Sequence, residues 1–233
     1  MNTRRSNIFS LMINLTVFIL TAYSVAHNFR TDIIREVETV NDKALTNFTN
    51  FASFRYFTTL SNVFAAISSA IILFFNVKNA IGDTYKFPKW AILVKYTAAC
   101  AVALTFTTVA LFLSPLLALN GASYFLLFEG NSFFFHFFLP LLTIIGFILF
   151  EKTPDPDFAF TFVAAVPTVL YAATYTVMVA ITKSWPDFYG FTYDGNYPLM
   201  AITVFFMCAG SYGLCVLIRF LRRKILPFPL NDG

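Results

Sequence analysis

Two polar helix faces hold the side chains of this sequence that could do chemistry in an apolar environment. Thr58, Asn62 and Ser69 recur at helical spacing in one apolar stretch, and His136 and Thr143 do so in another. A hydroxyl beside an imidazole can act as a nucleophile with a general base. A threonine alone more often bonds to its own helix backbone or packs as a small group. Both faces are therefore predicted to point into a helix bundle, with Thr58 and His136 at similar depth.

The two histidines differ in what their positions allow. An imidazole inside a membrane span is costly and can titrate near neutral pH, so His136 is a candidate functional group. His27 ends the first apolar stretch, where water can reach it, and is predicted to be structural. A membrane zinc hydrolase needs about three His or carboxylate ligands. With two histidines we expect no metal and no cofactor; a haem held by both histidines is the alternative.

Two charged residues near the outer ends of the spans could take part in catalysis or substrate binding. Asp187 lies in an aromatic loop, and a carboxylate there could orient and charge-stabilise the histidine, as in a nucleophile–base–orienter triad. Its alternative role is a solvated loop aspartate or a turn cap. Arg55 stands at the mouth of the second apolar stretch. It could bind a lipid headgroup or a substrate carboxylate, or it could extend to the membrane interface as an ordinary snorkelling residue.

The composition indicates that membrane helices position these residues. Hydrophobic residues make up 58% of the 233-residue chain and charged residues 12%, whereas soluble domains carry about 25% charged residues. A membrane-spanning helix needs about 20 apolar residues. We predict an all-α integral membrane protein, with residues 1–233 forming one six-transmembrane-helix bundle. Its basic residues cluster at span ends rather than in a patch, so nucleic acid is not an expected partner.

The spans can be placed along the chain from its apolar runs. The first is predicted to be a retained signal anchor, because its apolar stretch is long for a cleaved signal peptide. Residues 30–54 are predicted to form an interfacial segment, either an amphipathic surface helix or a solvated loop. Residues 116–131 are too short to cross and are predicted to form a half-helix broken at Asn120 and Gly121. The predicted spans are 8–28, 55–77, 90–114, 132–150, 158–182 and 199–220.

The basic residues predict the orientation. With the N-terminus in the cytoplasm, eleven of the sixteen Lys and Arg residues fall on the cytoplasmic side, so both termini are predicted to be cytoplasmic. Lys95 is counted among these span-end cations. No charged relay is then expected inside the spans, which argues against an ion-coupled transporter.

Short motifs in three regions of the chain suggest a family. The motifs are RYFTTLSN at 55–62, HFFLPLL at 136–142, and Tyr171 with Tyr175 followed by WPDFYGF at 185–191. Together they resemble small bacterial six-span proteins of the Pr6Pr type and, more distantly, the androgen-induced-gene/ADTRP family.

The resemblance implies an activity. Eukaryotic members are threonine hydrolases that cleave fatty-acid esters of hydroxy fatty acids with one Thr and one His. It therefore implies Thr58 as the nucleophile, with Thr59 as the alternative, and His136 as its base. It also implies membrane lipids as partners, a lipid-like substrate and a bacterial inner membrane. The competing interpretation is a non-enzymatic lipid-binding, transport or assembly protein.

Such a hydrolase needs a cavity that holds an acyl chain and its ester. Apolar walls with a few polar groups would suit this ligand. Asn62, one turn from Thr58, is the nearest side-chain amide that could stabilise an oxyanion. We predict a cavity open to the outer leaflet and lined by Thr58, Asn62, His136, Thr143, Tyr171 and Tyr175.

Overall fold

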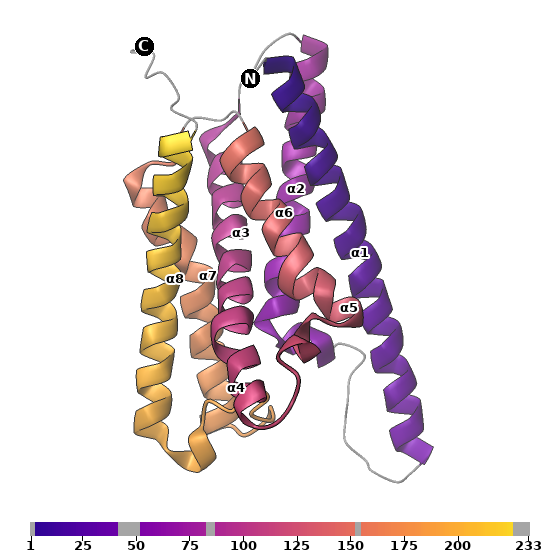
Figure 1. Ribbon diagram of the computed structural model, residues 1–233, viewed down its shortest axis with the longest axis vertical. Coiled ribbons are helices and arrows are strands. Elements are labelled where there is room, and N and C mark those ends of the chain that lie inside the picture. Colours follow the sequence, from indigo (N-terminus) through magenta and orange to yellow (C-terminus); the bar gives the residue numbers. More distant parts are fainter. Residues whose placement is uncertain (1–2, 42–51, 83–86, 152–154, 226–233) are drawn as a thin grey trace.

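The computed structural model describes residues 3–41, 52–82, 87–151 and 155–225, and the regular structure in these ranges is helical. Six of its helices are long and apolar enough to cross a membrane, which confirms the six-transmembrane-helix bundle. The first helix begins and the last helix ends at the same end of the bundle (Figure 1). The six candidate spans are Ser6–Arg30, Phe57–Ile81, Lys89–Leu119, Gly130–Phe150, Phe158–Ile181 and Tyr197–Ile225.

The first helix, α1 (Thr3–Asn41), continues well past its span. At about 1.5 Å per residue its 39 residues reach about 60 Å, twice the hydrocarbon thickness of about 30 Å. Residues 30–41 are thus a continuation of α1 rather than a separate helix, and 42–51 lie outside the described residues. A short 3₁₀ turn, η1 (Ala52–Arg55), then leads into α2 (Phe57–Gly82).

Two prolines shape the third and fourth spans. Pro115 and Pro140 each stand two residues after a π-helical turn. Proline has no N–H and its ring clashes with the carbonyl four residues earlier, so the preceding turn widens. The third span comprises α3 (Lys89–Thr108), η2 (Val109–Leu113) and α4 (Ser114–Leu119). The fourth comprises α5 (Gly130–Phe133), η4 (Phe134–Phe138), α6 (Leu139–Ile145) and η5 (Gly146–Phe150).

The predicted break at Asn120 and Gly121 is present, but the predicted half-helix over 116–131 is not, because residues 116–119 continue span three and residues 130–131 begin span four. After α4 the chain turns at Asn120 and Gly121, and Gly121 adopts a φ of +83° that glycine tolerates without steric cost. The 3₁₀ helix η3 (Tyr124–Phe128) follows. The remaining elements are α7 (Phe158–Thr176), η6 (Val177–Ile181), η7 (Tyr193–Gly195) and α8 (Tyr197–Ile225).

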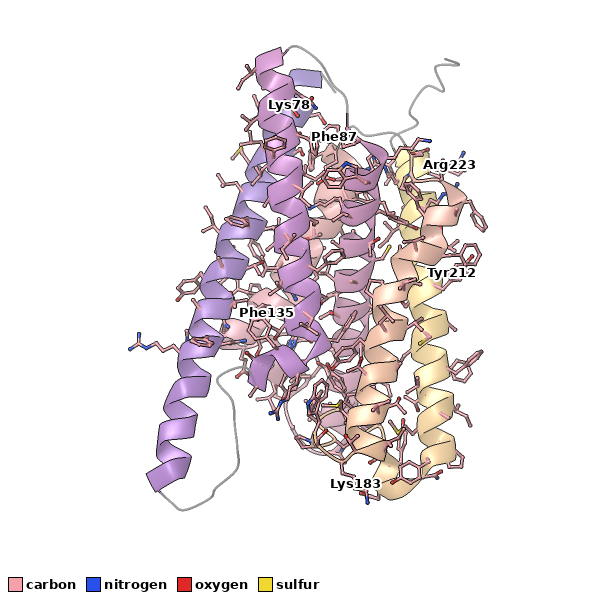
Figure 2. The ribbon with its side chains drawn as sticks, turned by 180° about the vertical axis from the view of Figure 1, so that it is seen from behind. Lys78, Phe87, Phe135, Lys183, Tyr212 and Arg223 are labelled. Carbon is pink, nitrogen blue, oxygen red and sulfur yellow. The ribbon has the colours of Figure 1, made fainter. Side chains whose placement is uncertain are left out.

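Helix α3 lies in the middle of the bundle, between α1 and α2 on one side and α7 and α8 on the other (Figure 1). It is buried almost continuously from Lys95 to Thr105, a run rich in alanine. Small side chains let neighbouring helices approach closely. The outward faces carry large apolar side chains such as Phe205 and Phe206, as expected for contact with membrane lipids (Figure 2).

The polar faces predicted to point inward do so. Asn62, Ser69 and Thr143 are all 0% exposed, and Thr58 is partly buried. Asn62 and Ser69 hydrogen-bond to groups on other helices, whereas Thr143 Oγ1 is buried without a hydrogen-bond partner among the described residues.

Candidate functional site

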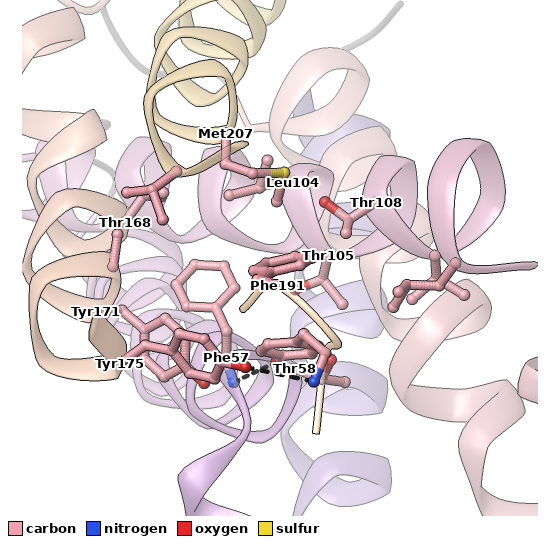
Figure 3. Close-up of a pocket in the computed structure, with 15 residues that line it drawn as sticks. Phe57, Thr58, Leu104, Thr105, Thr108, Thr168, Tyr171, Tyr175, Phe191 and Met207 are labelled. Carbon is pink, nitrogen blue, oxygen red and sulfur yellow. Dashed lines mark hydrogen bonds between the residues drawn. The ribbon is translucent and has the colours of Figure 1, made fainter. Parts of the chain in front are cut away.

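A cavity lies between α2, α3, α7 and α8, near the end of the bundle that carries Lys183 (Figures 2 and 3). Its volume is about 60 Å³. Its wall is mainly apolar, and no charged side chain lines it within the described part of the chain. Its polar lining groups are hydroxyls: threonines 58, 105, 108 and 168, and tyrosines 171, 175 and 189.

The cavity includes three of its six predicted lining residues. Thr58, Tyr171 and Tyr175 line it, whereas Asn62, His136 and Thr143 do not. The prediction of one cavity containing all six is therefore wrong. Helical spacing placed Thr58 and Asn62 on one inward face and His136 and Thr143 on another, but these faces meet different neighbours in the bundle.

Asn62 joins spans two and four instead of facing the cavity. Its Nδ2 donates to the carbonyl oxygen of Thr58 at 2.8 Å and to that of Phe135 at 3.0 Å. An amide nitrogen carries two protons, so both are used in these bonds. The bonds hold the backbone at Thr58 beside the residue preceding His136, but they leave no proton on Asn62 for an oxyanion.

The two adjacent threonines are not equivalent. Thr58 is partly buried and its side chain lines the cavity, whereas Thr59 is 4% exposed and does not line it. Of the two hydroxyl groups, that of Thr58 is the one a ligand in the cavity would meet.

His136 lies on the widened turn η4 that precedes Pro140. Its Nδ1 is 2.5 Å from the carbonyl oxygen of Leu127. A carbonyl can only accept, so this bond assigns the proton of the neutral ring to Nδ1 and leaves a lone pair on Nε2. That tautomer suits a general base, although the orienting group is a backbone carbonyl rather than a carboxylate.

Asp187 organises its own loop. Its carboxylate accepts hydrogen bonds from the Tyr175 hydroxyl, from the backbone N–H of Phe191 at 3.0 Å, and from both the N–H and the hydroxyl of Thr192 at 2.7 and 2.6 Å. Partial burial would raise the pKa of this carboxyl, but the hydrogen bonds, led by that from Thr192, outweigh it and lower the pKa. The role as an orienter of His136 is not supported by these contacts, and the turn-capping alternative fits them.

Arg55 bonds through its backbone to Tyr171, a residue of the cavity wall. Its carbonyl oxygen accepts a 2.6 Å hydrogen bond from the hydroxyl of Tyr171. This bond ties the start of α2 to α7. Binding of a headgroup or carboxylate by the Arg55 side chain stays a prediction.

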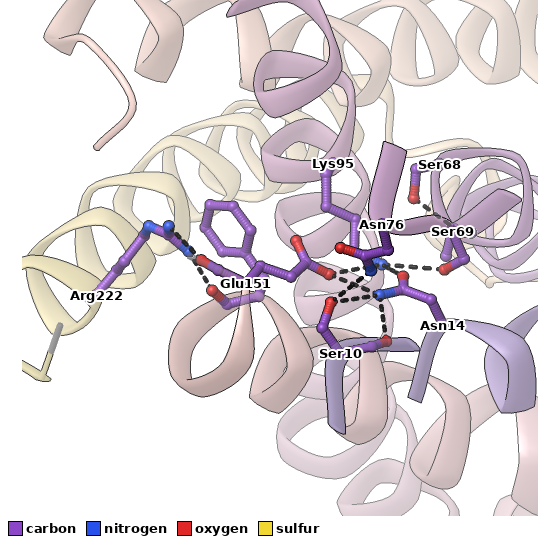
Figure 4. Close-up of polar contacts among 10 residues, drawn as sticks. Ser10, Asn14, Ser68, Ser69, Asn76, Lys95, Glu151 and Arg222 are labelled. Atoms are coloured by element: carbon purple, nitrogen blue, oxygen red, sulfur yellow. Dashed lines mark hydrogen bonds and ion pairs between the residues drawn. The ribbon is translucent and has the colours of Figure 1, made fainter. Parts of the chain in front are cut away.

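A second polar cluster lies near the other end of the bundle (Figure 4). Lys95 on α3 is 0% exposed, and its Nζ lies 2.7 Å from Asn14 Oδ1, 3.0 Å from Ser69 Oγ and 3.5 Å from Glu151 Oε1. Asn14 Nδ2 also donates to Glu151 Oε1 at 3.1 Å. The ammonium group therefore has three acceptors, from α1, α2 and the end of span four.

The end of span four is also held from α8. Arg222 is 1% exposed, donates to the carbonyl oxygens of Phe147 and Glu151, and lies over the Phe147 ring at 4.4 Å. A cation is favourable at a helix C-terminus, where carbonyls lack partners in the helix. Arg222 therefore caps span four.

The interpretation of Lys95 as a span-end cation is wrong. Lys95 lies six residues inside the span Lys89–Leu119, and Glu151 directly follows Phe150. Counting Lys95 as a span-end cation hid its burial. The signal available in the sequence was an isolated lysine followed by a long run without charge.

Neither the Thr58 cavity nor the Lys95 cluster resembles a metal site, because the described residues contain no group of three or more His, Cys, Asp or Glu side chains that could hold an ion.

Comparison with protein-family models, curated proteins and solved structures found no match for this chain.

Proposed function

We propose that this protein is an integral membrane hydrolase of fatty-acyl esters in which Thr58 is the nucleophile and His136 its base. The observation that carries the proposal is the position of the Thr58 hydroxyl in an apolar cavity whose other polar groups are hydroxyls. Such a cavity favours an uncharged, largely apolar ligand. The motif resemblance adds the threonine–histidine pairing.

The chemistry divides into two displacements. Thr58 Oγ1 attacks the ester carbonyl carbon while Nε2 of His136 accepts its proton. The tetrahedral intermediate collapses, and the departing alkoxide takes that proton to leave as an alcohol. Water then attacks the acyl-threonine ester with His136 again as base, which releases a fatty acid and restores Thr58.

The mechanism requires a rearrangement when substrate enters. A cavity of about 60 Å³ is smaller than the roughly 300–1,000 Å³ of ligand pockets, and His136 lies outside its wall. An acyl chain must therefore part the helices around Thr58. The Asn62 bridge between spans two and four is the link that keeps His136 close during this movement.

The proposal includes an orientation and a location. Lys78 and Arg223 lie at the end of the bundle where the first helix begins and the last helix ends, and Lys183 at the opposite end (Figure 2). We place the first end in the cytoplasm by the positive-inside rule, in a bacterial inner membrane. The Thr58 cavity then lies toward the outer leaflet, and its substrate is a membrane lipid ester.

A fluorophosphonate probe tests the mechanism. We expect covalent labelling at Thr58 that is lost in Thr58→Ala and in His136→Ala, while both variants keep their thermal stability in detergent. Labelling at Thr59 would retain the mechanism but shift the nucleophile by one residue. Unlabelled wild-type protein, with both variants less stable, would favour the alternative of a non-enzymatic lipid-binding, transport or assembly protein.

A further inference from the structure

The three tyrosines that line the Thr58 cavity differ in where their hydroxyl protons go. Tyr171 donates its proton to the carbonyl oxygen of Arg55 at 2.6 Å, and Tyr175 donates its proton to the carboxylate of Asp187. A carbonyl and a carboxylate can only accept, so both of these protons are committed to the protein.

Tyr189 has the opposite arrangement. Its hydroxyl oxygen accepts a 3.1 Å hydrogen bond from the backbone N–H of Phe57, the first residue of α2. Among the described residues no carbonyl or carboxylate accepts its own proton, and the hydroxyls beside it are those of Tyr171 and Thr58. Burial raises the pKa of Tyr189, although the nearby hydroxyl of Tyr171, the Phe57 N–H and the hydroxyl of Thr58 offset part of that rise. The group therefore stays protonated beside Thr58.

The ring of Tyr189 is held in place from several sides. Its centroid lies 5.3 Å from that of Phe191 in a stacked arrangement and 6.2 Å from that of Tyr56 in an edge-on arrangement. Its backbone N–H points at the Tyr175 hydroxyl at 3.4 Å. A donor fixed in advance stabilises developing charge more effectively than one that must first reorient.

We propose that the cavity binds the carbonyl group of a neutral fatty-acyl ester and that the hydroxyl of Tyr189 donates a hydrogen bond to the carbonyl oxygen. The inference rests on the proposed function for its chemical step, in which the same bond stabilises the oxyanion formed when Thr58 attacks. Tyr189 takes the role that sequence reasoning gave to Asn62, whose amide protons are both committed. A free carboxylate or a phosphate is disfavoured because, in the part of the chain that the structure describes, no charged side chain lines the cavity.

Substitution of one hydroxyl tests this role. In full-length protein in lipid nanodiscs, Tyr189→Phe should lower kcat for a p-nitrophenyl fatty-acyl ester by roughly 100- to 1,000-fold, as for loss of an oxyanion donor. The matched control is Tyr193→Phe in the same loop, whose hydroxyl bonds to Thr203 at 2.9 Å outside the cavity. We expect near wild-type kcat for the control. Each variant loses one hydrogen bond of its hydroxyl, so both should show a similar small loss of thermal stability. Unchanged kcat in Tyr189→Phe would overturn the proposal.

A binding measurement separates this inference from the proposed function. Two photoreactive lipids would be compared, an acyl ester and the matched ether that lacks the carbonyl. Tyr189→Phe should weaken cross-linking of the ester about three- to tenfold, the range for one hydrogen bond, and leave the ether unchanged. If the wild type binds the ester in this way without hydrolysing it, the hydrolase proposal fails and the Tyr189 contact stands. Equal effects on ester and ether would overturn the Tyr189 contact.

Discussion

The ammonium group of Lys95 lies 3.5 Å from the carboxylate of Glu151, and both side chains are only 1% exposed. Taking two charges out of water costs several kcal/mol each, and the pair recovers this only with good geometry and further hydrogen bonds. Asn14 supplies such bonds to both partners. One oxygen of Glu151, Oε2, is buried without a hydrogen-bond partner within the described residues.

Removing one partner of this pair should be strongly destabilising. Lys95→Met leaves the Glu151 carboxylate buried and unpaired, at an expected loss of about 3–5 kcal/mol, measured by reversible unfolding in mixed micelles. The double variant Lys95→Met/Glu151→Leu should recover most of this loss. The matched control is Lys89→Met, because Lys89 pairs with Asp157 at 3.9 Å with both side chains largely exposed. Lys89→Met should change the free energy of unfolding by no more than about 0.5 kcal/mol. An equal loss in Lys95→Met and Lys89→Met would contradict the stabilising role of the buried pair.

The hydrogen bonds to Asp187 predict a dependence of stability on pH. A carboxyl whose pKa is lower in the folded protein stabilises the fold above its unfolded pKa, near 3.8, and this contribution is lost as pH falls toward the folded value. The temperature of thermal unfolding, measured between pH 7 and pH 3, should therefore fall below about pH 4. This fall should be smaller in Asp187→Asn. At pH 7 the variant should lose about 1–2 kcal/mol of unfolding free energy, because it makes fewer and weaker hydrogen bonds than the carboxylate.

Asp194 offers a control in the same loop, because it is exposed. Asp194→Asn should retain the wild-type pH profile. If Asp187→Asn and the wild type lose stability in parallel as pH falls, the carboxylate is not the group that titrates.

Gly146 marks a close contact between spans one and four. A Cβ added there would lie 2.9 Å from Cγ2 of Ile13, a distance that forces a shift in a stiff β-branched side chain. Gly146→Ala should therefore destabilise the protein by about 1–3 kcal/mol. Gly213→Ala on α8 is the control, because a Cβ there meets no atom within 4 Å. An unchanged free energy of unfolding in Gly146→Ala would show that α1 can move away from span four at little cost.

The membrane orientation can be tested by labelling. In a background with Cys208 replaced by Ser, a membrane-impermeant maleimide added to intact cells should modify Lys43→Cys. Lys78→Cys should react only after permeabilisation, because Lys78 lies at the end where the first helix begins. The reverse pattern would invert the orientation and place the Thr58 cavity toward the inner leaflet.

The sequence by itself determined the six spans and the inward direction of their polar faces. An apolar run long enough to cross a bilayer is a local property, and helical spacing places Thr58, Asn62 and Ser69 on one face whatever surrounds it. Asn120 and Gly121 marked the break after span three for an equally local reason, since glycine accepts a positive φ.

Only the tertiary structure decided which partner each polar group meets. Asp187 bonds to Tyr175 and its own loop, Asn62 bridges to Phe135, and His136 bonds to Leu127. Lys95 is buried because α1 and the end of span four close over it. Helical spacing gives the direction of a side chain around its own axis, but the neighbour in that direction depends on how the helices pack and where loops and widened turns place their ends.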